Sequence, residues 1–221
     1  SPCPIQEAVL EVRYTASVPD DAILGMVYRY LGKVFNGGEP ETLPIMQLPT
    51  PVRRDDPNLR YQAHYRFRSG VNVFNLGPRA FSFSVLSPYP GWTSWSRFFQ
   101  EGLRRIKESD VVEHVERIGL RYINSFDQPI LPQVDLSISV SGQSLAQEPT
   151  HLRTQINDSG FLKILQVGNR VDINANGKKF EGSILDIDCI RRMDLDNEQF
   201  FDEYVEIVER AHEKEKEFFF A

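Results

Sequence analysis

Charged side chains that alternate with apolar ones are the residues of this chain with the clearest chemical potential. Four strand-like stretches, residues 8–15, 60–68, 115–124 and 151–156, place apolar residues on one face and charged residues on the other. Their polar faces carry the candidate ligand-binding residues Arg13, His64, Arg66, Arg117, Arg121 and Arg153. Guanidinium groups bind phosphate and carboxylate through paired hydrogen bonds, so these residues predict a site for an anionic ligand if the strands share one sheet.

An ordinary solvated sheet face is the alternative interpretation of the same pattern. Half-exposed antiparallel sheets turn charges to solvent, and acidic neighbours such as Glu11 neutralise them. The residue types do not choose between these two interpretations. If a ligand binds there, a nucleotide or the end of a nucleic acid is the expected class.

The usual sequence motifs for catalysis and for binding cofactors or metals are mostly absent from this sequence. It has no Gly-rich phosphate loop, no dinucleotide-binding fingerprint, no HExxH and no CxxC, so we predict no catalytic residue and no cofactor. Asp186 and Asp188 share one face of a strand and resemble half of a magnesium site. Because a metal needs further ligands, we interpret them as a solvated hairpin face and predict no metal site. The histidines are isolated at positions 64, 114, 151 and 212.

Two aromatic groups invite a functional interpretation. Trp92 and Trp95 have the ring type that stacks on bases or sugars, although such residues more often anchor a helix on a sheet. Phe218, Phe219 and Phe220 follow a strongly charged helical stretch and need cover. We predict that these three phenylalanines face a partner, either another protein or a second copy of the chain.

Three amphipathic helices are predicted from apolar residues at helical spacing. The first ends near residue 35, the second follows a proline-rich corner at residues 88–92, and the third runs towards residue 220. Their predicted N-caps are Asp20, Thr93 or Ser94, and Asp196.

Further strands follow from alternation between turn residues. They are predicted at residues 71–76, 80–86, 134–140, 161–167, 171–174 and 182–190. Asn176-Gly177 predicts the turn of a hairpin between the last two. The stretch 44–48 is flanked by prolines and is expected to form an edge strand, and residues 53–56 are expected in a solvated loop.

The order of these elements repeats loosely on either side of residues 115–124. Each half has a strand, a connection, a meander of strands and a long helix, although the second half lacks a helix after its first strand. Glu11-Val-Arg-Tyr14 and Gly119-Leu-Arg-Tyr122 share an apolar-Arg-Tyr core, which chance explains about as well as duplication does. We therefore predict one intertwined α+β domain over residues 1–221, with antiparallel meanders, three long amphipathic helices and halves at 1–114 and 115–221. Residues 115–124 are expected to join the two halves in one sheet.

Composition limits the class of protein. The chain has 221 residues, 41% of them hydrophobic, and a formal net charge of −6, which argues against a protein that coats nucleic acid through general basicity. Local binding of nucleic acid stays open. No run of 18 apolar residues and no signal peptide is present, so no membrane span is expected. Two cysteines far apart favour a reduced, cytoplasmic protein.

Three segments together resemble a family of uncharacterised, sporadically distributed prokaryotic proteins. They are Pro4-Ile-Gln-Glu-Ala-Val9, Tyr89-Pro-Gly-Trp92 and Glu116-Arg-Ile-Gly-Leu-Arg-Tyr-Ile-Asn124, to which Ala211-His-Glu213 adds a fourth match. The similarity spans nearly the whole chain. It implies a prokaryotic, cytosolic protein, and no activity or functional residue accompanies it.

Two classes of function follow from the sequence. The first is a binding or interaction module that works as a homo-oligomer or in a complex with another protein. The second is an enzyme or sensor for a phosphorylated ligand, held by the arginine-rich strand faces. Because no nucleophile, base and metal cluster is recognisable, we favour the first.

Overall fold

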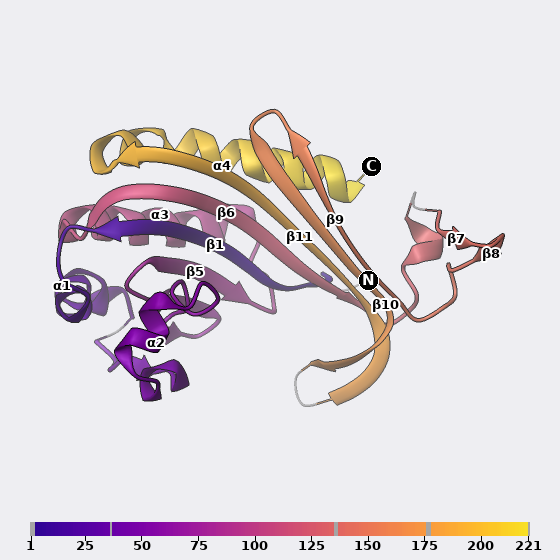
Figure 1. Cartoon of the computed structure of the whole chain (residues 1–221), viewed down its shortest axis with the longest axis horizontal. Helices are drawn as coiled ribbons and strands as arrows, with labels where there is room; N and C mark the ends of the chain where they lie inside the picture. The colour runs from indigo at the N-terminus through magenta and orange to yellow at the C-terminus, as the bar shows by residue number, and fades with distance from the viewer. Residues whose placement is uncertain (1–2, 36, 135–136, 176–177, 221) are drawn as a thin grey trace.

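Alternating apolar residues build a single large antiparallel sheet in the computed structural model, which describes residues 3–35, 37–134, 137–175 and 178–220 (Figure 1). Within these residues the sheet has nine strands in the order β2-β3-β4-β5-β1-β6-β11-β10-β9, which confirms the predicted α+β class. The strands are β1 (Ile5–Ala16), β2 (Glu41–Thr42), β3 (Tyr65–Ser69), β4 (Asn72–Leu76), β5 (Ala80–Leu86), β6 (Val112–Phe126), β9 (Thr150–Asp158), β10 (Phe161–Ala175) and β11 (Lys178–Asp196).

Strand β6 joins the two parts of the sheet, as the sequence predicted for residues 115–124. It pairs with β1 on one side and with β11 on the other, both antiparallel. Leu10 lies opposite Leu120 and Val12 lies opposite Ile118. All four side chains are buried on the face that the helices cover, so apolar contact and backbone pairing hold this junction together.

The β1·β6 pair is extended on both sides by a strand that returns from a meander. In the first half β5, the last strand of a meander, returns to pair with β1, and in the second half β11 returns in the same way to β6. Glu11 and Gly119 hold matching positions in the two similar segments and lie directly opposite each other. The register of β1 with β6 is therefore symmetric about this position within the two similar segments.

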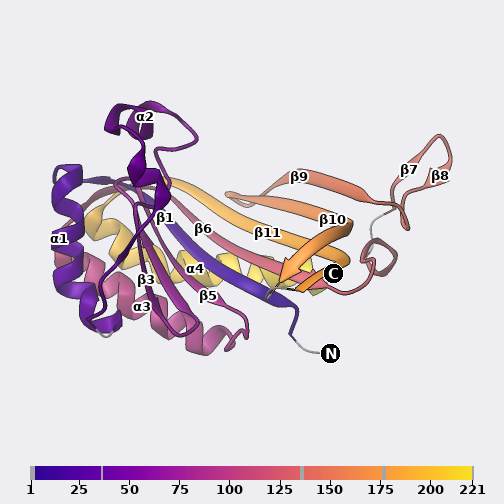
Figure 2. The same cartoon turned by 90° about the horizontal axis from the view of Figure 1, so that it is seen from below.

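Helices cover one face of the sheet. They are α1 (Asp20–Leu31), α3 (Trp92–Ser109) and α4 (Asn197–Phe220). Figure 2 shows α3 and α4 on one side of the sheet and the short α2 (Thr50–Asp55) on the other. The main core lies beneath α1, α3 and α4, where the largest side chains that are fully buried include Trp95, Phe83 and Phe99.

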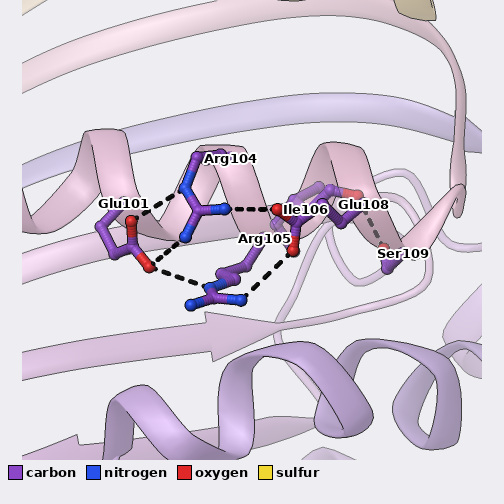
Figure 3. Close-up of polar contacts among 6 residues, drawn as sticks. All are labelled: Glu101, Arg104, Arg105, Ile106, Glu108 and Ser109. Atoms are coloured by element: carbon purple, nitrogen blue, oxygen red, sulfur yellow. Dashed lines mark hydrogen bonds and ion pairs between the residues drawn. The ribbon is translucent and has the colours of Figure 1, made fainter.

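The solvent face of α3 carries a ladder of ion pairs (Figure 3). Glu101 binds both Arg104 and Arg105, and Glu108 binds the same two arginines from the next turn. These side chains are largely exposed, so solvent and salt screen each pair and its contribution to helix stability is small. The ladder thus supports the helix, while the apolar face holds it on the sheet.

Prolines produce helical turns where a strand and a loop were expected. Residues 44–48 are not an edge strand, because Pro44–Gln47 forms a 3₁₀ helix. Residues 53–56 are not a solvated loop, because Thr50–Asp55 forms α2. In both cases a proline occupies the first helical turn, where its fixed φ angle favours helix and its missing N–H has no cost.

Two predicted strands are shorter than expected. Only the end of residues 60–68 is a strand, since β3 begins at Tyr65 and the Asp56 carbonyl accepts hydrogen bonds from the N–H groups of Leu59 and Arg60 in a turn. Of residues 134–140, only Ser139–Val140 form a strand, β7, which pairs with β8 (Gln143–Ser144). This small hairpin projects beyond the end of the main sheet (Figures 1 and 2).

The predicted hairpin of the second half is present but longer. β10 runs continuously through residues 161–167 and 171–174, which were predicted as separate strands, and β11 extends the predicted strand 182–190 at both ends. Their pairing has one register shift, between Gly168 and Val171. They approach each other at Ala175 and Lys178. The predicted turn residues 176–177 lie outside the described part of the chain.

The three helix starts follow different local chemistry. Asp196 is the N-cap of α4, because its Oδ1 accepts the Gln199 N–H at 2.9 Å. Asp20 is not an N-cap; Pro19 occupies that position, and Asp20 lies in the first turn, where its charge still favours the positive end of the helix. α3 begins at Trp92, before the predicted Thr93 or Ser94, after Gly91 with φ 88°.

None of the described helices is long and apolar enough to span a membrane.

Close contact between α3 and β5 predicts a large effect of one methyl group. A Cβ atom at Gly102 would lie 2.1 Å from Cε1 of the buried Phe83 ring. We therefore expect Gly102→Ala to lower the free energy of unfolding by about 1–3 kcal/mol, measured by urea denaturation with tryptophan fluorescence. Gly25→Ala in α1 is the matched control, because no atom lies within 4 Å of its Cβ, and it should gain up to about 1 kcal/mol. Equal effects of both changes would contradict this packing.

Candidate functional site

The predicted arginines gather on the face of the sheet that α3 and α4 leave open. Pairing places Arg13 opposite Arg117 and Arg121 opposite Asp188, and neighbouring strands contribute the other carboxylates. We call this group the central charged cluster. It consists of Glu11, Arg13, Arg117, Arg121, Asp186 and Asp188.

Ion pairs within the cluster occupy its arginines. Arg117 Nη1 lies 2.5 Å from Glu11 Oε1, and Arg117 Nη2 lies 3.3 Å from Asp188 Oδ2. Arg121 binds Asp186 in a bidentate manner, with Nε–Oδ1 at 2.7 Å and Nη2–Oδ2 at 2.5 Å. Within the cluster three guanidinium groups therefore face three carboxylates, while the exposed Arg192 lies opposite Arg117 in the strand pairing and adds a further positive charge beside it.

Gly119 accommodates the cluster rather than a ligand. A Cβ atom there would lie 3.2 Å from both Arg117 Nη2 and Asp188 Oδ1. Because Gly119 has no side chain, the Arg117 guanidinium can lie over this position of β6 and reach Asp188 on β11. The groups that approach the backbone at Gly119 are therefore Arg117 and Asp188, which form an ion pair within the protein.

Burial controls the protonation of this cluster. It raises the pKa of Asp188 to about 6, with Glu11 and Asp186 adding to the rise and the two arginines opposing it. Burial also lowers the pKa of Arg117. The two carboxylates once compared with a magnesium site are engaged by Arg117 and Arg121, and among the described residues no group of three His, Cys, Asp or Glu side chains could hold a metal ion.

Arg66 and Arg153 extend the polar face towards its two ends. Arg66 Nε donates to Asn75 Oδ1 at 2.9 Å, so its partner is an amide rather than a carboxylate. Arg153 lies on β9, and with the Gln155 amide oriented to accept, its Nη1 and Nη2 donate to the Gln155 side-chain oxygen at 2.9 and 2.8 Å. The structure therefore brings Arg13, Arg66, Arg117, Arg121 and Arg153 onto one face, spread along it instead of converging in a pocket.

His64 lies apart from that face, in a cleft of about 480 Å³ between α1 and α2. Its Nδ1 lies 3.4 Å from Arg53 Nη1, and burial together with the Arg53 charge lowers the His64 pKa. Arg53 Nε is buried without a hydrogen-bond partner among the described residues. Sequence reasoning missed Arg53, because it assigned these residues to a solvated loop.

The predicted aromatic residues pack within the chain where the structure describes them. Trp95 is fully buried, and Trp92 stacks on His212 with ring centroids 3.8 Å apart. Phe219 packs against a second small core beneath β10 and β11, so it contacts its own chain. The side chains of Phe218 and Phe220 lie outside the described part, and their predicted partner-facing role stays a prediction.

Strand β9 forms one edge of the sheet. It pairs with β10 over its whole length without a register shift, and no other described strand pairs with it. The connecting turn has Ser159 at φ 51° and Gly160 at φ 84°, which is the type I′ geometry of a two-residue hairpin. Asp158 and Phe161 are then a hydrogen-bonded pair, and alternation along the ladder leaves four residues with outward N–H and C=O groups. These are His151, Arg153, Gln155 and Asn157.

Comparison with models of known families and with curated proteins finds no match, so the family resemblance of the three segments stays a prediction.

The raised pKa of Asp188 predicts a pH-dependent effect of Asp188→Asn. An unfolded aspartate loses its proton near pH 4, whereas folded Asp188 keeps its proton to about pH 6. The stability that this proton contributes is present below about pH 4 and is lost as pH rises through 6. Because Asn resembles the protonated form, the variant should gain on the parent by about 3 kcal/mol between pH 4 and pH 7, at 1.36 kcal/mol for each unit of pKa difference.

Urea denaturation across this pH range measures the difference. Asp202→Asn is the control, since this carboxylate is exposed on α4. The control should follow the parent at every pH. A constant difference between parent and Asp188→Asn would rule out a proton retained by Asp188.

Proposed function

We propose that this protein is an interaction module that self-associates through the outer edge of β9. The observation that carries the proposal is a nine-residue edge strand with outward backbone groups and no strand partner in the described part of the chain. Such an edge is a template for pairing with another strand. Two copies joined there form one continuous sheet.

Protection of sheet edges supports this assignment of β9. Edge strands are commonly shortened, interrupted by proline or bulged, which prevents pairing with other chains. The opposite edge follows this rule, because β2 has only two residues. β9 contains no proline and shows no bulge against β10, so its edge is regular and open.

The β9 sequence is complementary to itself in one antiparallel register. With Thr154 opposite Thr154 of a second copy, Leu152 lies opposite Ile156 and Arg153 lies opposite Gln155. Ile156 is 38% exposed in one chain, and this pairing covers it with an apolar neighbour. Moving the centre to Arg153 would bring two arginines together, so charge favours the Thr154-centred register over that one. The occupant we propose is therefore a second copy of this chain.

Replacing one outward N–H group tests the dimer. Gln155→Pro removes a donor that faces outward, so the pairing with β10 is kept while the pairing between copies is lost. We expect the parent to be a dimer and this variant a monomer, by light scattering after gel filtration.

Gln155→Ala is the matched control, because it keeps the N–H and removes only the side chain. It should remain a dimer, and circular dichroism should show both variants folded. A monomeric parent at about 100 μM, or a dimeric Gln155→Pro, refutes self-association through β9, since a dissociation constant above this concentration corresponds to less than about 5.5 kcal/mol of binding free energy.

A small-anion site in the α1–α2 cleft is a second candidate function, and it retains the phosphorylated-ligand class. Arg53, Arg60 and Arg79 line this cleft, and none of them forms an ion pair with a described carboxylate. The buried Arg53 Nε without a partner is the specific observation in its favour, because buried donors normally have one. Asp20 and Asp21 line the other wall, which limits the excess of positive charge and ranks this function second.

Pyrophosphate is the probe for the cleft. Calorimetry at low salt should show saturable binding to the parent, weakened at least tenfold by Arg53→Ala, since a charge-assisted contact contributes about 1.5–3 kcal/mol. Arg97→Ala, an exposed arginine of α3, is the control and should bind like the parent. Absence of saturable heat in the parent, or equal loss in both variants, excludes a specific site.

A further inference from the structure

Helix α4 carries a carboxylate that is almost completely buried. Glu215 is 3% exposed, and its Oε1 has no hydrogen-bond partner among the described residues. An isolated buried carboxylate is costly, so native proteins pair or protonate such groups. The contacts of the described fold therefore do not account for the burial of Glu215 Oε1 without a partner.

Nearby lysines are engaged with other carboxylates. Lys216 contacts Glu213 at 3.0 Å, and Lys214 contacts Asp158 at 2.7 Å. Each of these ammonium groups thus has a carboxylate partner other than Glu215, although Lys216 lines the same pocket as Glu215. Burial raises the pKa of Glu215 well above its ordinary value and Asp188 and Asp186 raise it further, while a backbone hydrogen bond at Cys189 and the Lys163 charge oppose the rise. The ionised form of Glu215 is therefore favoured only when a further cation lies beside it.

Glu215 lines a pocket of about 320 Å³ between α4, the start of β1 and the start of α3. Trp92, Tyr89 and Tyr122 contribute aromatic rings to the walls, and most of the lining is apolar. The pocket reaches solvent beside Cys3 and Lys216, which are exposed. Its volume suits a small organic molecule.

Contacts among the ring residues hold the walls in place. Trp92 stacks on His212 with an interplanar angle of 7°, and the Tyr122 hydroxyl lies 3.1 Å from His212 Nδ1. Burial lowers the pKa of His212 to about 4, so its ring is neutral at pH 7. The pocket thus combines fixed aromatic faces with one carboxylate and no cationic imidazole.

We propose that this pocket binds a small organic cation, of the alkylated ammonium class, with Glu215 as its counter-charge. Aromatic faces attract such cations through the ring quadrupole, and their apolar methyl groups suit the apolar lining. A carboxylate supplies the full negative charge that a neutral ligand would leave unmatched. The site is independent of the β9 edge and of the α1–α2 cleft.

Choline and its uncharged isostere 3,3-dimethyl-1-butanol are the probes. Trp92 and Trp95 are the only tryptophans of the chain, so the Trp92 indole signal can be followed by NMR and assigned with Trp92→Phe. We expect choline to shift this signal in a saturable way. The isostere should bind at least tenfold more weakly, because shape is matched and only charge differs.

Glu215→Gln provides the second arm, since it keeps the shape of the side chain and removes its charge. It should weaken choline binding at least tenfold, whereas Glu217→Gln, an exposed carboxylate of the same helix, should not. No saturable shift in the parent up to about 50 mM choline overturns the proposal, since binding weaker than this is below about 2 kcal/mol. Equal binding of the isostere also overturns it, and this comparison needs no variant.

Discussion

Pairing of β1 with β6 is the interaction on which the rest of the structure depends. It links two meanders that are distant in sequence, and it places the apolar residues of both strands on one face. Side chains alternate strictly along a strand, so the same pairing places the charged residues on the other face. A shift of one residue in this register would exchange the two faces, bury the arginines beneath α3 and α4, and expose the apolar core.

Charge compensation within the central charged cluster follows from this register. Because the strands bring arginines and carboxylates of different segments into contact, the central charged cluster compensates its own charges. Removing one partner of such a group leaves a buried charge unpaired, which costs more than the pair itself contributes. The cluster is therefore best understood as part of what sets the register of β1, β6 and β11.

The sites proposed for binding lie around this sheet, not at its centre. One is the free edge of β9, one is the cleft at α1 and α2, and one is the pocket at the end of α4. Each has a polar group whose partner is missing from the described chain: outward backbone groups, Arg53 Nε, or Glu215 Oε1. The charged groups at the centre of the sheet pair with one another. A ligand or a second copy can therefore form new favourable interactions mainly with the unpartnered groups at the margins.

Local periodicity determined much of the fold from the sequence alone. Alternation in residues 8–15 and 115–124 and helical spacing after Asp196 identify β1, β6 and α4, because buried faces repeat every second residue in strands and every 3.6 in helices. It also identified the strand arginines that share the open face. It failed at residues 44–56, where prolines flank short segments with no repeating pattern, and where 3₁₀ and α turns form instead.

Tertiary structure alone decided which charges are satisfied. Arg121 and Asp186 are 65 residues apart in sequence, and Arg117 and Asp188 are 71 residues apart. The local sequence around these residues does not predict that they form ion pairs. In the same way, Glu215 belongs to a run of charges typical of a solvated helix, yet the end of α4 docks it beneath β11 beside Tyr122 and Trp92. Burial and charge neighbours come from contacts between distant segments, so a pattern within one segment predicts that a residue is charged and on which face, but not what it binds.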